Sequence, residues 1–321
     1  MSVNDNIAVV IAAAAIAYGT PLVFAALGEI LAERSGVLNL GVEGMMLLGA
    51  VAASWVATDL GGPGALVLTV ALVAAMVLAA AGAAIHAFLT ITLRVNQIIS
   101  GLALTIFAGI AGVSSYLAGI WDLGRGPVPH QFDDLNVFGL ASTPVVGPII
   151  FEQTALTYLS WLAVALVSVY LFRTRLGLQL RAVGEAPQTA DSVGIDVVRT
   201  RYAHVLIGGA FAGLAGACFS LSIVPQWVNG MTAGQGWIAL ALVIFGFWRP
   251  DLMLVGAYLF GGLSSLRFTL QARGVDVPSA LLDALPYLMT IVVLVVVSNS
   301  AARRRLGTPA ALGLPFEREE R

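Results

Sequence analysis

The side chains that could take part in chemistry are few and lie far apart. The sequence has one cysteine, Cys218, and none of its three histidines belongs to an HExxH motif or to a Cys/His cluster. It contains no lysine, which excludes a P-loop because that loop needs a lysine to bind nucleotide phosphates. It also lacks a GxSxG nucleophile motif. The residue types therefore argue against a zinc enzyme, a serine hydrolase and a nucleotide-hydrolysing protein.

Glu43 is the acidic residue with the clearest functional potential, since it stands between apolar neighbours. An ionisable group in such a position either serves a transport pathway or pairs with an opposite charge, here an arginine. Asn39 lies four residues before it, and the glycines around both should unwind a helix and free backbone polar groups. We predict that Asn39 and Glu43 lie on a substrate pathway. Glu29, Glu33 and Arg34 are interpreted instead as interfacial charges at a helix end.

Two further amides, Asn96 and Gln97, begin a later apolar stretch directly after Arg94. Their side chains can supply polar groups to the same pathway, and we include both as candidate pathway residues. Helix capping is the alternative role.

The elements that must position these residues are membrane-spanning helices. Of the 321 residues, 59% are hydrophobic and only 11% are charged, and the mean hydropathy is +0.91. A charge at the centre of a spanning helix costs roughly 2.5–3.5 kcal/mol, so long uncharged stretches mark the spans. We predict an all-α, polytopic integral membrane protein with about nine spans, within a range of eight to ten. The predicted spans are 7–31, 40–58, 65–91, 96–118, 154–172, 202–222, 235–248, 252–271 and 284–301.

The arginines predict the orientation of these spans, because cytoplasmic loops retain basic residues. With nine spans, 13 of the 16 arginines fall on one side, which places the amino terminus outside and the carboxyl terminus in the cytoplasm. The transmembrane domain is then 1–305, with an external loop at 120–152 and a cytoplasmic loop at 173–201. The cytoplasmic tail, 306–321, ends in a run of charges and is predicted to be disordered.

The cytoplasmic loop contains a sequence typical of a short docking helix at 182–195. Pro187 suits a first helical turn and Gly194 suits a left-handed stop. Small residues on such a helix would let a partner approach closely. An ordinary amphipathic loop helix is the alternative. The residues that we assign to docking are Arg181, Ala182, Gly184, Glu185, Pro187, Ala190, Asp191 and Gly194.

Two separated motifs resemble one family of transport proteins. The sequence LRAVGEAPQTADSVGI, residues 180–195, resembles the coupling loop of ABC importer permeases of the ribose, branched-chain amino acid and nucleoside type. The sequence GEILAERSGVLNLGVEGMMLLGAVAASW, residues 28–55, resembles the other signature of this group, in its simple-sugar and nucleoside branch. With the spacing of the spans, the resemblance covers nearly the whole chain, although ribose-type permeases usually have one more leading span.

This resemblance implies a permease subunit in a bacterial plasma (inner) membrane that translocates nucleosides or simple sugars. It implies two cytoplasmic ABC ATPases docked on the coupling helix, a second permease that is either a sister chain or a second copy, and an extracytoplasmic solute-binding protein. ATP and magnesium would bind the ATPases, so we expect no cofactor in this chain. The lipid bilayer is a further partner, and nucleic acid is not expected.

A second broken region, 225–237, falls where a later span should begin. It would mirror the first break if the fold contains an inverted repeat, which would bring both breaks near one pathway. An external loop with interfacial tryptophans is the alternative.

An ion-coupled secondary transporter of small polar solutes is the alternative function, and an intramembrane enzyme is a third class. The secondary transporter should carry several intramembrane carboxylates, whereas only Glu43 qualifies clearly. The enzyme would need a catalytic motif of the kinds that the sequence lacks.

Overall fold

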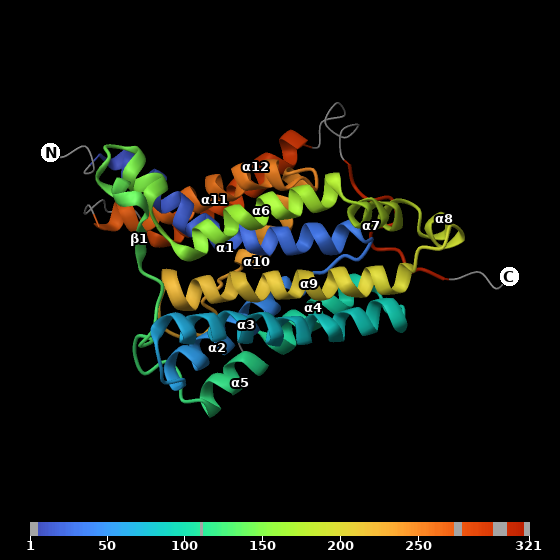
Figure 1. Cartoon of the computed structure of the whole chain (residues 1–321), viewed down its shortest axis with the longest axis horizontal. Coiled ribbons are helices and arrows are strands. Elements are labelled where there is room, and N and C mark those ends of the chain that lie inside the picture. Colours follow the sequence, from blue (N-terminus) through green and yellow to red (C-terminus); the bar gives the residue numbers. More distant parts are fainter. Residues whose placement is uncertain (1–5, 110–111, 273–277, 298–306, 318–321) are drawn as a thin grey trace.

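The protein is a bundle of long helices that run roughly along one direction (Figure 1). The computed structural model describes residues 6–109, 112–272, 278–297 and 307–317. Its α-helices are α1 (Ile7–Arg34), α2 (Val42–Asp59), α3 (Gly64–Ala87), α4 (Gln97–Ala108), α5 (Val113–Ile120), α6 (Ala155–Arg173), α7 (Arg175–Glu185), α8 (Pro187–Ser192), α9 (Val197–Cys218), α10 (Gln235–Phe245), α11 (Pro250–Ala272) and α12 (Ser279–Val297). Short π-helical turns extend α3 (Phe88–Thr92) and α9 (Phe219–Ile223).

The helices confirm a polytopic membrane protein. Among the described residues, five segments are long and apolar enough to cross a bilayer: Ile7–Arg34, Gly64–Thr92, Gln97–Ile120, Ala155–Arg173 and Val197–Ile223. The third of these combines α4 and α5. Each of the nine predicted spans coincides with helix in the described part of the chain, and α10 and α11 are shorter apolar helices. The fourth span differs from the prediction, because α4 ends at Ala108 and α5 starts at Val113.

The bundle has two distinct ends, which Figure 1 shows on opposite sides. One end carries α7 and α8. The other carries the start of α1 and a small hairpin in which β1 (Asp134–Asn136) pairs antiparallel with β2 (Glu152–Thr154). A 3-10 turn (Val137–Ser142) and a π-helical turn (Gly147–Phe151) lie between these strands. We call these the α7–α8 end and the hairpin end.

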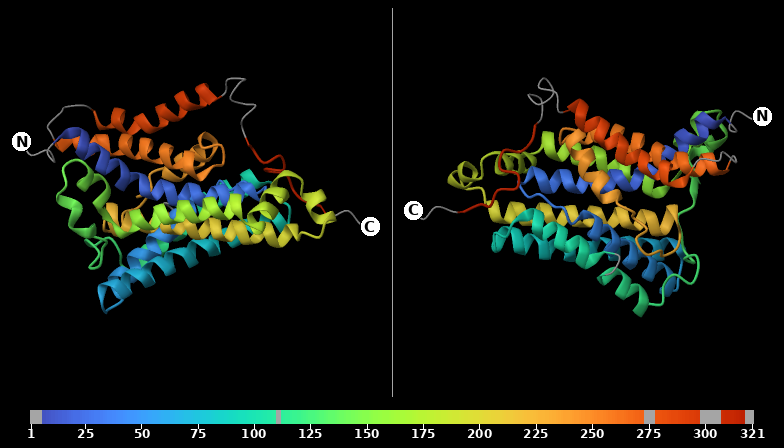
Figure 2. Two further views of the ribbon diagram at one scale, coloured as in Figure 1. Left: turned by 45° about the horizontal axis from the view of Figure 1, so that its top comes forward. Right: turned by 180° about the vertical axis from the view of Figure 1, so that it is seen from behind.

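Helices α1 and α9 lie between two flanks, with α11 and α12 on one side and α2 to α5 on the other (Figure 2). Close approach between the central helices depends on glycine. A Cβ atom at Gly28 of α1 would lie 2.5 Å from the Gly208 carbonyl oxygen of α9, and one at Gly49 of α2 would lie 2.5 Å from Gly213 Cα. Small residues at such contacts allow helix backbones to pack tightly without a hydrophobic driving force.

Two predictions about the α7–α8 end are wrong. The docking segment is not one helix over 182–195, because α7 ends at Glu185 and α8 begins at Pro187. The cause is Pro187, since a proline lacks the N–H that would continue the helix and restricts the residue before it. Gly194 does adopt the predicted left-handed conformation, with φ of 88°. The predicted disorder of the tail is wrong for residues 307–317, which are placed against the bundle, while the predicted boundary at 305/306 lies outside the described residues.

Candidate functional site

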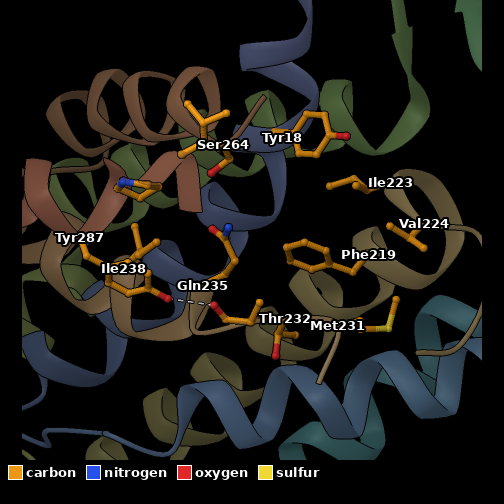
Figure 3. A pocket seen from close by; sticks show the side chains of 13 residues that line it. Tyr18, Phe219, Ile223, Val224, Met231, Thr232, Gln235, Ile238, Ser264 and Tyr287 are labelled. Carbon is orange, nitrogen blue, oxygen red and sulfur yellow. Dashed lines mark hydrogen bonds between the residues drawn. The ribbon is translucent and has the colours of Figure 1, made fainter. Parts of the chain in front are cut away.

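A cavity of about 380 Å³ opens between α1, α10, α11, α12 and the connection that leads into α10 (Figure 3). Its volume is within the range of roughly 300–1,000 Å³ that is usual for small-molecule sites. The residues that line it are Tyr18, Phe219, Ile223, Val224, Met231, Thr232, Ala233, Gln235, Ile238, Ser264, Leu282, Pro286 and Tyr287.

The lining of this cavity combines aromatic, aliphatic and neutral polar side chains. Among the described residues that line it, none is Asp, Glu, Arg or His. Within the described part of the chain, Gln235 Oε1 and Ser264 Oγ are buried and have no hydrogen-bond partner. Figure 3 shows the Gln235 side chain extending between Ser264 and Phe219. The described part of the lining therefore offers hydrogen bonds to a ligand and no complementary charge.

Glu43 fixes one wall of the cavity from behind. Its Oε1 accepts hydrogen bonds from Thr232 Oγ1 at 2.6 Å and from the Gly234 N–H at 2.9 Å, and its Oε2 accepts one from the Gly236 N–H at 2.6 Å. The Glu43 side chain is buried, with 7% of the residue exposed. A carboxylate at a helix start satisfies free N–H groups and interacts favourably with the helix dipole. Glu43 thus caps α10, and the predicted pairing with an arginine is not what the structure shows.

The two broken regions of the chain meet at this carboxylate. The first break, 35–41, follows α1, and the second, 224–234, follows the π-helical end of α9. Helix α1 ends and α9 begins at the α7–α8 end, so the breaks follow helices that run in opposite directions (Figure 1). This is the order expected for an inverted repeat. The interfacial position expected for Trp227 in the external-loop alternative is wrong, because Trp227 is 6% exposed and packs among Leu47, Val51 and their neighbours.

The other predicted pathway residues support the first break and do not line the cavity. Asn39 is fully buried, where its Nδ2 donates to Glu29 Oε1 at 3.0 Å and its Oδ1 accepts from the Gly41 N–H at 3.0 Å. Gln97 Oε1 accepts from the Leu38 N–H at 2.6 Å. The structure therefore assigns these two amides to holding the break in position.

Asn96 takes the alternative role that the sequence suggested. Its Oδ1 accepts hydrogen bonds from the backbone N–H groups of Ile98 at 3.0 Å and Ile99 at 3.1 Å, which caps the start of α4. Asn96, like Asn39, Glu43 and Gln97, is not among the residues that line the cavity.

Several lining residues were missed by sequence reasoning. Gln235 carries a recognisable signal, because it lies between two glycines directly after the second break. Tyr18, Ser264 and Tyr287 lie inside long apolar runs, and a polar group there cannot be assigned to a cavity without knowing which face of its helix turns inward.

At the α7–α8 end, the small residues pack within this chain rather than facing a partner. Gly184 is buried, and a Cβ atom there would overlap the Arg34 carbonyl oxygen at the end of α1. Ala190 is 3% exposed and packs with Val183 and Val197. The predicted use of Gly184 and Ala190 for the close approach of a partner is therefore wrong.

The outward surface of this end is formed by other side chains of the segment. Glu185 is exposed, as are residues of α8 such as Gln188 and Thr189, and Val193 is 72% exposed. Pro187 is buried, whereas Asp191 is half-buried.

Residues 307–317, which we call the carboxyl-terminal strap, tie this end together. The Ala311 N–H donates to the Gly184 carbonyl at 2.9 Å, and the Gly313 N–H donates to the Gly36 carbonyl at 3.2 Å. Phe316 packs against the cluster that contains Ala190. The strap thus contacts both the docking segment and the first break.

Two buried arginines also bond to the strap at this end of the bundle. Arg201 is 1% exposed, and it donates to the Ser35 carbonyl at 3.1 Å and to the Leu314 carbonyl at 3.2 Å. Arg34 donates to the Gly307 carbonyl at 3.0 Å. Arg34 is 8% exposed and Glu33, which accepts from Trp248 Nε1 at 2.5 Å, is 3% exposed, so the interpretation of both as interfacial charges is wrong.

Comparisons with known proteins identify the family. Residues 11–294 match the model of the family described as branched-chain amino acid transport system / permease component. The chain is 42% identical to a putative glucose ABC transporter permease protein of Haloferax volcanii, over 94% of this chain and 95% of that protein. It is 36% identical to a nucleoside ABC transporter permease protein of Lactococcus lactis subsp. cremoris, over 92% and 93%.

A guanosine ABC transporter permease protein of Bacillus subtilis is 34% identical, over 97% of this chain and 98% of that protein. No solved structure gives a significant match. The coverage of these relatives is nearly complete in both directions, and the family model spans the bundle from α1 to α12. The chain belongs to the permease component family of the branched-chain amino acid transport system, and it is a multi-pass membrane permease.

Proposed function

We propose that this chain is the permease subunit of an ABC importer that passes a neutral polar solute, a nucleoside or a simple sugar. The observation that carries this proposal is the cavity, whose described lining residues offer aromatic surface and hydrogen-bonding groups without a charged side chain. The relatives named for glucose, nucleosides and guanosine support the same substrate class.

A branched-chain amino acid suits this cavity poorly, although the family description names that substrate. A free amino acid carries an ammonium and a carboxylate group, and each needs a charged or strongly polar partner away from water. The start of α10 would favour an anion, but Glu43 already occupies it. A neutral ligand avoids both costs.

The energy for transport would come from cytoplasmic ABC ATPases that bind ATP and magnesium and dock on α7 and α8. In this proposal Arg181, Ala182, Glu185 and Asp191 lie at or near the docked surface. The hairpin end would receive an extracytoplasmic solute-binding protein, and a sister chain or a second copy would complete the pathway. The amino terminus would then lie outside a bacterial inner membrane and the carboxyl terminus in the cytoplasm.

The contacts suggest how movement of the docking segment reaches the cavity. A push on α7 acts on the end of α1 through the Gly184 contact and on the first break through the strap. The first break continues into α2, whose Glu43 accepts hydrogen bonds from Thr232 in the cavity wall and from Gly236 at the start of α10. The cavity wall would therefore move with the docking segment. In this proposal the subunit itself performs no covalent chemistry.

The secondary-transporter alternative is not favoured by the position of Glu43. A coupling carboxylate must be able to exchange its ion or proton. Both Glu43 oxygens already accept hydrogen bonds, and these hold the start of α10.

Uptake by cells that lack the chromosomal gene and carry it on a plasmid tests the proposal. We expect uptake of labelled uridine or glucose to be restored, to need cellular ATP and to survive collapse of the ion gradients. Labelled leucine is the comparison substrate and should not accumulate. Restored leucine uptake, or uptake that stops when the ion gradients collapse, would contradict the proposal.

A further inference from the structure

We propose that Gln235 and Ser264 form a nucleobase-recognition site in the cavity, so that the permease itself prefers nucleosides to sugars. This inference rests on the proposed function, because it takes the cavity to lie on the transport pathway. It goes further by naming the ligand class and the side chains that select it.

The first step is the state of the two polar groups. Gln235 Oε1 and Ser264 Oγ are both buried without a partner in the described part of the chain, and both residues line the cavity. A buried polar group without a hydrogen bond is destabilising, and native proteins keep such groups where a ligand or another function uses them. A ligand that bonds to both groups would remove this cost.

The second step is the way in which the fold aims Gln235. It is the first residue of α10, and the backbone N–H groups on either side of it, at Gly234 and Gly236, are both bound by Glu43. The Gln235 backbone is therefore held from behind while its side chain extends into the cavity toward Ser264 of α11 (Figure 3). Two consecutive helices, α10 and α11, thus supply one polar wall.

The third step is the match to a nucleobase. A glutamine amide presents a donor and an acceptor side by side, and this pattern pairs with the edge of a base through two hydrogen bonds. The faces of a base are apolar and stack on aromatic rings. Phe219 and two tyrosines, Tyr18 and Tyr287, supply aromatic surface around the Gln235 side chain.

The fourth step is the poor match to a hexose. A sugar presents hydroxyl groups around its whole ring, and each needs a partner when it leaves water. Other polar side chains of the lining already have bonds: Thr232 Oγ1 donates to Glu43, and the Tyr287 hydroxyl donates to the Ala233 carbonyl at 3.0 Å. The apolar remainder, which includes Ile223, Val224 and Leu282, suits the face of a base better than a ring of hydroxyl groups.

Ligand-detected saturation-transfer NMR on the full chain in lipid nanodiscs tests this inference without a binding protein or an ATPase. The probes are uridine, adenosine and glucose. We expect saturation of the base protons of both nucleosides and weak saturation of glucose. Gln235→Leu should weaken nucleoside binding roughly 5- to 150-fold, as expected for the loss of two hydrogen bonds, and Ser264→Ala should act in the same direction with a smaller effect.

Gln179→Leu is the matched control, because Gln179 is exposed on α7, outside the cavity. Each variant must keep the unfolding temperature of the parent, which separates a loss of contact from a loss of fold. Glucose binding that equals nucleoside binding would overturn the nucleobase assignment and leave the proposed transport of neutral solutes intact. Nucleoside binding that is unchanged in both cavity variants would also overturn it. Failure of the uptake experiment, by contrast, would contradict the proposed function itself.

Discussion

At the scale of single residues, Glu43 shows how a buried charge can be both structural and close to function. Its carboxylate accepts three hydrogen bonds from the segment 232–236, two of them from backbone N–H groups. Thr232, Ala233 and Gln235 of this segment line the cavity, so the position of the wall depends on a side chain that does not line it.

Replacing Glu43 with glutamine tests this role. The amide keeps one acceptor oxygen, but its NH₂ group cannot accept the hydrogen bond from a backbone N–H. We expect Glu43→Gln to lower the free energy of unfolding by about 1–3 kcal/mol, because it leaves a buried N–H group unpaired. Thermal unfolding of the purified chain in detergent measures the loss.

Glu152→Gln is the matched control, since Glu152 is exposed in β2 and pairs through its backbone. It should leave the unfolding temperature unchanged. Equal stability of Glu43→Gln and the parent would show that the carboxylate is not needed as a cap for α10.

At the scale of elements, the docking segment packs directly against the helices of the bundle. Gly184 packs on the end of α1, and its carbonyl accepts a hydrogen bond from the strap at Ala311. A side chain at Gly184 must therefore displace either the end of α1 or α7 itself.

Gly184→Leu should abolish uptake while leaving the amount of protein in the membrane unchanged. The added side chain forces α7 away from α1, whereas the spanning helices that direct insertion are untouched. Uptake of a labelled substrate and the membrane content of the chain are measured in the same cells.

Gly119→Leu provides the control, because a Cβ atom at Gly119 in α5 would meet nothing within 4 Å. It should transport normally. Normal uptake by Gly184→Leu would contradict a role of this contact in coupling the docking segment to the bundle.

The elements also show what sequence could and could not predict. Long uncharged stretches determine where helices cross the membrane, because charge is costly there, and the nine predicted spans coincide with helices. Glycines and prolines also predicted the two breaks, because these residue types interrupt a helix locally. The division of the docking segment at Pro187 was also readable, since proline restricts the residue before it.

Hydrogen bonds between residues far apart in the sequence could not be predicted from such local patterns. Nothing local indicates that Arg201 bonds to Ser35 and Leu314, which lie 166 and 113 residues away. The strap looks disordered in the sequence because its order comes from such distant contacts. The same holds for the cavity, whose lining comes from α1, the end of α9, the connection into α10, α10 itself, α11 and α12.

At the scale of the whole molecule, the two ends of the bundle differ in what they expose. The α7–α8 end presents Val193 in a turn after α8, with 72% of the residue exposed. The hairpin end presents Phe138, with 88% exposed. The proposed importer requires the first end to face the cytoplasm and the second to face the outside, as the distribution of arginines also predicts.

Cysteine labelling tests this orientation directly, because the native thiol does not interfere. Cys218 is buried, with 1% exposed, and burial protects a thiol from reagents in water. We expect a membrane-impermeant maleimide to label Phe138→Cys in intact cells and Val193→Cys only in inverted membrane vesicles or after permeabilisation. The parent chain should stay unlabelled in each preparation. Labelling of Val193→Cys in intact cells would reverse the orientation, and with it the assignment of α7 and α8 to ATPase docking.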